Sequence, residues 1–117
     1  MTAMPTALAF AAGVRAFDER DYGTAAQNFC EVLAAEPHNT NAREYLARSY
    51  YHRASLGRAE AECRTLLAED PTNEYVLLLL IRSLERKGRT EEAAALRRQL
   101  AVMSGDERHL ANHTIAS

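Results

Sequence analysis

The chain has 117 residues, of which 47% are hydrophobic and 26% charged, and its formal net charge is −2. That length suits one domain able to bury a core without disulfides or metals. The slightly negative charge excludes the broad basic field through which proteins bind nucleic acid. The longest uninterrupted apolar run, YVLLLLI at 75–81, is too short to cross a bilayer, so no membrane insertion is expected.

The composition favours a predominantly α-helical domain. Ala, Leu, Arg and Glu dominate, whereas the five Gly and three Pro are few. The apolar start of the chain lacks a preceding basic segment, so we expect no signal peptide and a cytoplasmic location. Cys30 and Cys63 fall within helical patterns and are therefore expected to be reduced, small apolar residues.

Apolar periodicity, polar breaks and prolines predict six helices in chain order. They cover residues 6–19, 22–35, 40–54, 57–69, 74–87 and 90–103, and a short tail follows at 108–117. Asp21 and Thr90 are placed to cap the helices that begin beside them. After the proline turns, Asn39 and Asn73 are placed to do the same. Gly88 is expected to adopt positive φ past the end of a helix.

The predicted helices recur as pairs at a constant interval. Pro37 and Pro71, which each end the second helix of a pair, lie 34 positions apart (71 − 37). Ala25, Ala59 and Ala93 keep the same interval. The chain therefore divides into three units over residues 6–39, 40–73 and 74–107, and such units need to stack because one helix pair cannot bury its apolar face alone.

A helix–turn–helix unit of this length that ends near a proline resembles the tetratricopeptide repeat. The DYGTA turn of the first unit fits the family pattern, as do apolar residues at matching positions of the units: Ala12, Gly13, Ala25, Phe29, Val32 and Pro37; Leu46, Ala47, Tyr50, Ala59, Cys63, Leu66 and Pro71; Leu77, Leu80, Leu84, Ala93 and Leu100. The resemblance implies an all-α fold, a right-handed α-α superhelix of three helix-turn-helix repeats, which forms a single domain over residues 1–117.

The third unit departs from the family pattern. Arg97 stands where a core aromatic residue is usual, and Gly105 stands where proline is usual. Arg97 and Arg98 are expected on the outer face of the last helix, with nothing stacked beyond them. In the second unit, Arg43 replaces a large apolar residue.

The resemblance also implies a function, because repeats of this kind line a concave surface with their first helices and bind peptides there. The residues carried over to that groove are Phe10, Val14, Phe17, Glu44, Arg48, Tyr51, His52, Tyr75, Leu78, Arg82 and Arg86. The expected partner is a protein or peptide, and the chain is expected to act as an interaction scaffold or adaptor.

Two parts of this groove have plainer alternatives. Phe10, Val14 and Phe17 either form an apolar strip for a partner helix or extended segment, or pack internally. The arginines at 48, 82 and 86 either clamp a carboxylate or pair with glutamates on their own helices. Glu44 with Arg48, and Glu85 with Arg89, have the spacing of such pairs.

One class of partner is not expected. Family members that bind acidic chaperone tails do so with a clamp of Lys, Asn and Arg side chains. We match the clamp to five positions that lack a suitable head group, namely Phe10, Val14, Tyr45, Tyr75 and Leu79.

Nothing in the sequence indicates an enzyme, a cofactor or a metal site. No Ser/His/Asp order, glycine-rich phosphate loop or CxxC motif occurs, and His109 and His113 have only the spacing of a two-histidine site without further ligands. The alternative to peptide binding is self-association, as a possible homodimer or a chaperone-like subunit of a larger complex, through the end of the stack or through the apolar first helix around Ala7, Leu8, Phe10 and Ala11.

Overall fold

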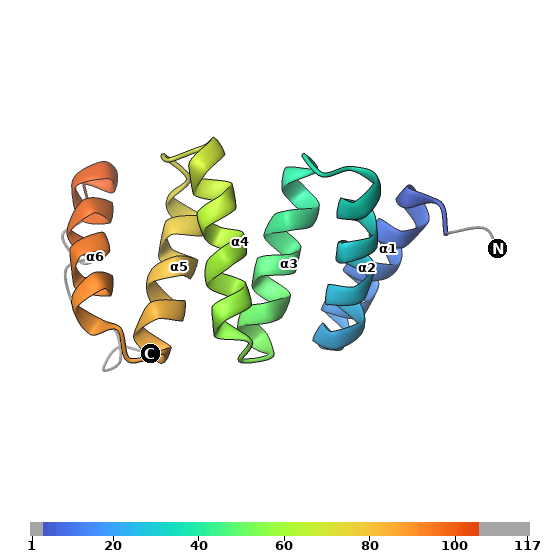
Figure 1. Cartoon of the computed structure of the whole chain (residues 1–117), viewed down its shortest axis with the longest axis horizontal. Coiled ribbons are helices and arrows are strands. Elements are labelled where there is room, and N and C mark those ends of the chain that lie inside the picture. Colours follow the sequence, from blue (N-terminus) through green and yellow to red (C-terminus); the bar gives the residue numbers. More distant parts are fainter. Residues whose placement is uncertain (1–3, 106–117) are drawn as a thin grey trace.

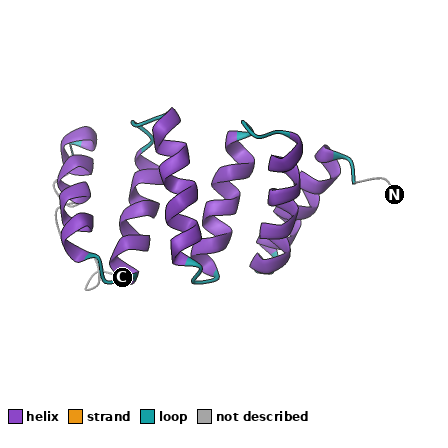
Figure 2. Cartoon of the chain, viewed as in Figure 1, coloured by secondary structure: helices purple, strands orange, loops and turns teal. Residues whose placement is uncertain are grey.

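The computed structural model describes residues 4–105, which form six α-helices joined by short loops (Figure 1, Figure 2). The helices are α1 (Thr6–Asp18), α2 (Tyr22–Ala35), α3 (Thr40–His52), α4 (Leu56–Glu69), α5 (Glu74–Arg86) and α6 (Thr90–Ser104). Every predicted boundary lies within two residues of the observed one. The predicted tail at 108–117, with His109 and His113, lies outside the described residues.

The helices stack in chain order as three pairs. Each helix packs chiefly on its neighbours in the sequence, and the first helices of successive pairs, α1 with α3 and α3 with α5, also touch (Figure 1). This arrangement confirms the predicted all-α stack of helix pairs. It leaves α1 and α6 at the two ends of the described stack and sets α1, α3 and α5 beside one another.

Side-chain caps start three of the helices as the sequence predicts. The side chains of Asp21, Asn39 and Asn73 accept hydrogen bonds from the backbone N–H groups of Thr24, Ala42 and Val76, at 3.2, 2.9 and 3.1 Å. These bonds satisfy N–H groups that have no partner within their own helix.

The predicted cap at Thr90 is wrong. Thr90 is already the first residue of α6, and Arg89 occupies the capping position without a side-chain bond to the helix. The cause is the preceding turn, in which Gly88 has a φ of +81°, as predicted, and the Arg89 N–H bonds back to the carbonyl of Leu84. The helix therefore begins one residue earlier than a Thr90 cap requires.

The core consists of two clusters that cross the boundaries between pairs. One joins α1, α2 and α3 around Phe29, and the other joins α3, α4, α5 and α6 around Leu77, Leu80 and Leu84. Cys63 is fully buried in the second cluster, and burial raises the pKa of its thiol to about 12. Cys30 is exposed, and both cysteines are free thiols, as predicted.

Arg97 corrects a second expectation. Its side chain is 3% exposed and lies inside the last helix pair, where Nε and Nη2 donate to Glu85 at 2.7 and 2.9 Å. The prediction that it faces outward is wrong, because the carboxylate of Glu85 on α5 lets a charged group occupy a core position. Arg98 is exposed, as expected for an outer face.

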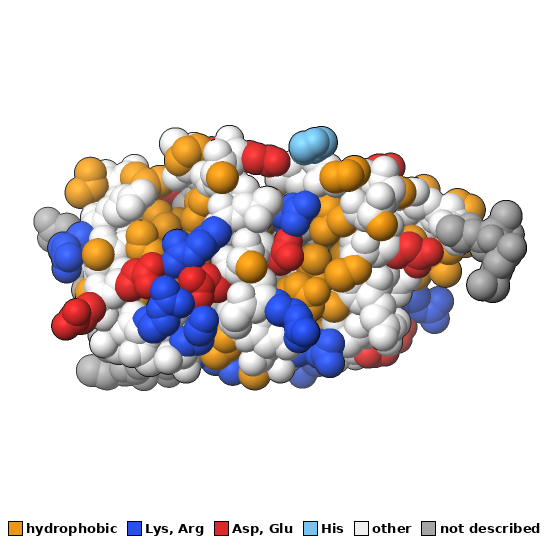
Figure 3. All heavy atoms as spheres, viewed as in Figure 1, with side chains coloured by type: hydrophobic (Ala, Val, Ile, Leu, Met, Phe, Trp, Pro, Cys, Tyr) orange, Lys and Arg blue, Asp and Glu red, His pale blue; other side chains and the backbone are white. Residues whose placement is uncertain are grey.

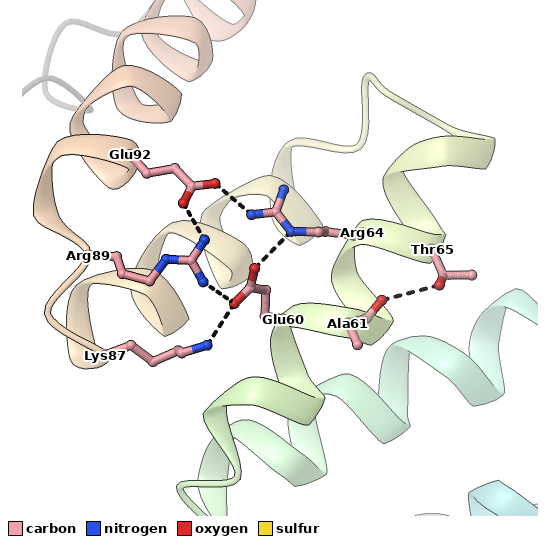
Figure 4. A network of polar contacts seen from close by, with 7 residues as sticks. All are labelled: Glu60, Ala61, Arg64, Thr65, Lys87, Arg89 and Glu92. Atoms are coloured by element: carbon pink, nitrogen blue, oxygen red, sulfur yellow. Dashed lines mark hydrogen bonds and ion pairs between the residues drawn. The ribbon is translucent and has the colours of Figure 1, made fainter.

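A second network of charges ties α4 to the last pair (Figure 4). Glu60 accepts from Arg64, Lys87 and Arg89 at 2.9, 2.9 and 2.7 Å, and Glu92 bonds to Arg64 and Arg89. Acidic and basic side chains gather over this part of the surface, around α4, α5 and α6 (Figure 3). Burial alone would raise the pKa of Glu60, but hydrogen bonds from Lys87 and Arg64 outweigh it and lower that pKa below its ordinary value.

We expect Glu60→Gln to lower the free energy of unfolding by about 1 kcal/mol at neutral pH, because three cations lose the charge of their shared partner. Since the folded-state pKa of Glu60 lies below the ordinary 4.5, its contribution is complete above that value and is lost as the pH falls through the folded-state pKa. Denaturant titrations from neutral pH to about pH 3 should show the stabilities of the wild type and the variant converging in acid.

Glu31→Gln provides the control for this pH series, because Glu31 is an exposed carboxylate on α2 outside the network. It should change the stability by less than about 0.5 kcal/mol. An effect of Glu60→Gln that is equally large at neutral pH and about pH 3 would contradict the proposed role of the carboxylate charge.

Candidate functional site

A pocket lies between the first helices of the second and third pairs. It is lined by Arg48, Tyr51 and His52 of α3 and by Tyr75, Leu78, Leu79 and Arg82 of α5. Six of these seven residues belong to the predicted groove set, because residues at spacings of three and four share one helical face. The structure therefore brings the central part of that set together at one place.

The lining combines an apolar surface with positive charge. Tyr75 is 49% exposed and Leu78 is half-buried, so both offer apolar contact at the pocket. The guanidinium of Arg48 lies over the rings of Phe17 and Tyr75, 4.6 and 5.8 Å from their centroids. Such stacking holds the cation in place while leaving its N–H groups able to bond at the ring edges.

The arginines of this face have no carboxylate partner within residues 4–105. Arg86 lies over the Tyr51 ring at 4.8 Å and donates to the Tyr51 carbonyl at 3.1 Å, which places it beside the pocket although it does not line it. Arg82 is exposed. By contrast, the networks around Glu60 and Glu85 bind Arg64 on α4, Lys87 and Arg89 in the turn before α6, and Arg97 on α6.

The helix-surface ion pairs that the spacing favours do not form. Arg48 turns to the aromatic rings and not to Glu44, which is half-buried, and Arg89 binds Glu60 and Glu92 while Glu85 binds Arg97. The alternative of pairing along one helix therefore does not hold for Glu44 with Arg48 or for Glu85 with Arg89. Glu85 and Arg89 instead find partners on a neighbouring helix, Arg97 and Glu60, and a same-helix pair that contributes only a few tenths of a kcal/mol does not compete with these contacts.

His52 lies at the edge of the pocket among aromatic rings and cations. Its imidazole stacks on Tyr22 with centroids 4.6 Å apart and meets Phe17 edge to face. Burial against these rings lowers the pKa of His52, and the charges of Arg48 and Arg86 lower it further. The ring is therefore neutral at physiological pH, where it offers aromatic surface and no charge.

The aromatic strip on α1 packs partly inward. Phe10, Val14 and Phe17 are half-buried against the first core cluster, and Phe10 meets Phe29 edge to face at 5.5 Å. Phe10 also lines a second, more open hollow with Ala7 and Asn41. These three residues therefore pack internally with part of their surface, and the remaining part is exposed and apolar.

Two of the five clamp positions pack against the core in the structure. Tyr45 stacks on buried Phe29 at 4.9 Å, and Leu79 is only 7% exposed, so both are mainly packing residues. The neighbouring positions on the same helices that line the pocket openly are Arg48, Leu78 and Arg82. Tyr75, a third matched position, lines the pocket without a charged head group, so the expected absence of this clamp stays a prediction, and the cations at the pocket come from Arg48 and Arg82.

Other kinds of site find no support in the described part of the chain. Between residues 4 and 105, no three His, Cys, Asp or Glu side chains are grouped so that they could hold a metal ion. No helix in that range combines the length and the apolar character needed to cross a membrane.

The helix pairs recur at a constant length and stack in chain order, and a pocket lies on their first helices. These features define an α-helical repeat protein. A family model for the tetratricopeptide repeat matches residues 10–74. The chain therefore belongs to the tetratricopeptide repeat family. A comparison with curated proteins finds no match.

Solved structures of tetratricopeptide repeat (TPR) domains share this fold. The TPR domain of Arabidopsis OM64 is 19% identical with a TM-score of 0.78, and the match covers 90% of this chain and 87% of that one. The first TPR of Spaghetti (RPAP3), bound to the HSP90 peptide SRMEEVD, is 15% identical with a TM-score of 0.80 and coverages of 95% and 88%. The TPR2B domain of yeast Sti1, in its pHsp70 complex, is 16% identical with a TM-score of 0.75 and coverages of 97% and 89%. At these identities the likeness shows the fold alone.

Proposed function

We propose that this protein is a binding module that holds a segment of a partner protein against the face of α1, α3 and α5. The observation that carries the proposal is the pocket between α3 and α5, where exposed aromatic surface lies beside arginines without carboxylate partners in the described chain. Arg and Tyr are enriched at the centres of protein interfaces, so this combination suits contact with a partner.

The size of the pocket favours a side chain over a small molecule. Its volume is about 110 Å³, below the roughly 300–1,000 Å³ that is usual for small-molecule sites. The hollow at Phe10 and Asn41, on the α1 side of α3, would give an extended or helical segment a second place of contact. A linear polypeptide that runs across the first helices can use both.

The chemistry of the lining indicates the composition of the segment. Tyr75 and Leu78 can cover one apolar side chain, and Arg48 and Arg82 can donate to a carboxylate beside it. An acidic residue next to an apolar one satisfies both requirements. The peptide SRMEEVD in the similar RPAP3 structure has this composition, which supports the choice of ligand class.

A library of short random peptides, selected on the full chain, tests the proposal. The wild type should enrich Asp and Glu next to Leu, Met, Val or Phe. Arg82→Glu, which reverses an exposed charge at the pocket, should weaken the binding of the enriched peptides at least tenfold, or about 1.4 kcal/mol.

The matched control for this charge reversal is Arg58→Glu, at an exposed arginine on α4 that lines neither the pocket nor the hollow at Phe10. It should change the affinity less than about twofold, because an exposed charge distant from the ligand contributes little at physiological salt. Enrichment of basic peptides, the absence of any consensus, or a consensus peptide that binds the Arg82→Glu variant as well as the wild type would refute the proposed function.

A further inference from the structure

Equivalent positions on the first helices carry different charges. Residues 14, 48 and 82 are equivalent in the 34-residue repeat (48 − 14 and 82 − 48), and residues 18 and 86 are also equivalent (86 − 18 is two repeats of 34). Arg48 on α3 and Arg82 on α5 thus correspond to apolar Val14 on α1. Arg86 on α5 corresponds to Asp18 on α1, which is exposed. At these positions the cations lie on α3 and α5, whereas α1 has an acidic residue.

The hollow between α1 and α3 adds a second carboxylate on the α1 side. Glu36 lines it from the turn before α3 and is exposed. The remaining lining residues are small, aromatic or amide side chains, namely Thr6, Ala7, Phe10, Asn39 and Asn41. Among the described residues, no Arg or Lys side chain lines the hollow, so the charge at this place is negative.

Ion pairs do not cancel the charge at either end of the face. The arginines that border the pocket have no carboxylate partner within residues 4–105, because Glu85 on α5 is bound to Arg97 of α6. Glu36 accepts a hydrogen bond from the Asn39 amide at 2.9 Å but forms no ion pair in that range, and neither does Asp18. The face therefore has a negative end at α1 and a positive end at α5.

We infer that the partner segment is bipolar and binds in one orientation, with a basic residue at the hollow between α1 and α3 and its acidic residue at the pocket between α3 and α5. The inference rests on the proposed function, to which it adds a second specificity site and a fixed direction. The reversed orientation would place a cation beside Arg82 and a carboxylate beside Glu36, and like charges that meet across an interface select against that arrangement. A segment that is acidic throughout is disfavoured at the α1 end for the same reason.

The stack also limits the spacing of the two charges in the segment. The hollow and the pocket lie on opposite sides of α3. Neighbouring helices pack about 8–10 Å apart, and an extended chain advances about 3.3 Å per residue. The basic and acidic residues of an extended segment should therefore lie at least about three positions apart.

A peptide library with a fixed central Leu-Glu-Leu and randomised positions on both sides tests the inference on the full chain. The wild type should enrich Lys or Arg on one side of the centre only, at least about three positions from the Glu. Glu36→Lys should abolish this enrichment and weaken the selected bipolar peptide at least about threefold, whereas the same peptide with Gln at the basic position should change less than about twofold.

Glu31→Lys is the matched control, at an exposed carboxylate on α2 that lines neither the hollow nor the pocket. It should leave the enrichment of basic residues unchanged. Circular dichroism should show this variant and Glu36→Lys folded, because both positions are exposed.

Photo-crosslinking of the selected peptide decides its orientation. A photoreactive phenylalanine beside the basic residue should label α1 or the turn at 36–39, and one beside the central Glu should label α5. The inference would be overturned by the absence of basic residues, by their enrichment on both sides, by an enrichment that survives Glu36→Lys, or by labelling of the same helix from both positions. In these cases Leu-Glu-Leu peptides still bind, so the proposed function stands. If no such peptide bound the wild type, the proposed function and this inference would both fail.

Discussion

Replacing Arg97 by Leu should lower the free energy of unfolding by about 3 kcal/mol. The wild-type guanidinium is 3% exposed and makes two bonds to Glu85, whose side chain is itself only 18% exposed. Removal of the cation leaves that carboxylate largely buried without this partner, which costs more than the pair itself contributes. Denaturant-induced unfolding followed by circular dichroism measures the difference.

Two further variants show whether the orphaned charge causes the loss. Arg98→Leu makes the same change one residue later on the exposed face of α6, and it should alter stability by less than about 0.5 kcal/mol. The double variant Glu85→Leu with Arg97→Leu should recover at least about 1 kcal/mol of the single-variant loss, because the uncompensated carboxylate is gone. A double variant less stable than Arg97→Leu alone would refute this account.

The second large effect is expected at Gly13 on α1. A Cβ atom there would lie 2.8, 2.9 and 3.0 Å from three ring carbons of Phe29, which is fully buried and cannot retreat without disturbing Tyr45. Alanine is the better helix former by about 1 kcal/mol, but overpacking a core typically costs about 1–3 kcal/mol. We expect Gly13→Ala to be destabilising by about 2 kcal/mol, measured by denaturant titration.

Gly57 on α4 supplies the comparison for this substitution. A Cβ atom at Gly57 would meet only the end of the flexible Lys87 side chain at 4.0 Å. Gly57→Ala should therefore raise stability by a few tenths to about 1 kcal/mol, in the opposite direction from Gly13→Ala. If both substitutions proved stabilising, the close packing of α1 on α2 would not be what requires glycine at position 13.

Part of the candidate site could be predicted from the sequence, and part could not. Tyr51, Tyr75 and Leu78 share one face of their helices, and helical spacing alone was enough to group them. The spacing could not show that Arg48 turns to Phe17 and not to Glu44, since that choice depends on how closely α1 approaches α3.

The sequence by itself determined the elements and their order. Apolar periodicity, prolines and capping residues such as Asp21, Asn39 and Asn73 act through neighbours a few positions away, so they can be read without knowledge of the fold. A constant interval between equivalent residues then specified the stack of helix pairs, because each unit must bury its apolar face on the next.

Only the tertiary structure decided which charges are bound and which remain available. Arg97 is a core residue because Glu85 lies opposite it on another helix, and Glu60 gathers cations from α4 and from the turn after α5. Ion pairing depends on distances between side chains that are remote in sequence, and a shift of a few ångströms exchanges one partner for another. For that reason the arginines that border the pocket could be identified as lacking carboxylate partners in residues 4–105 only once the helices were in place.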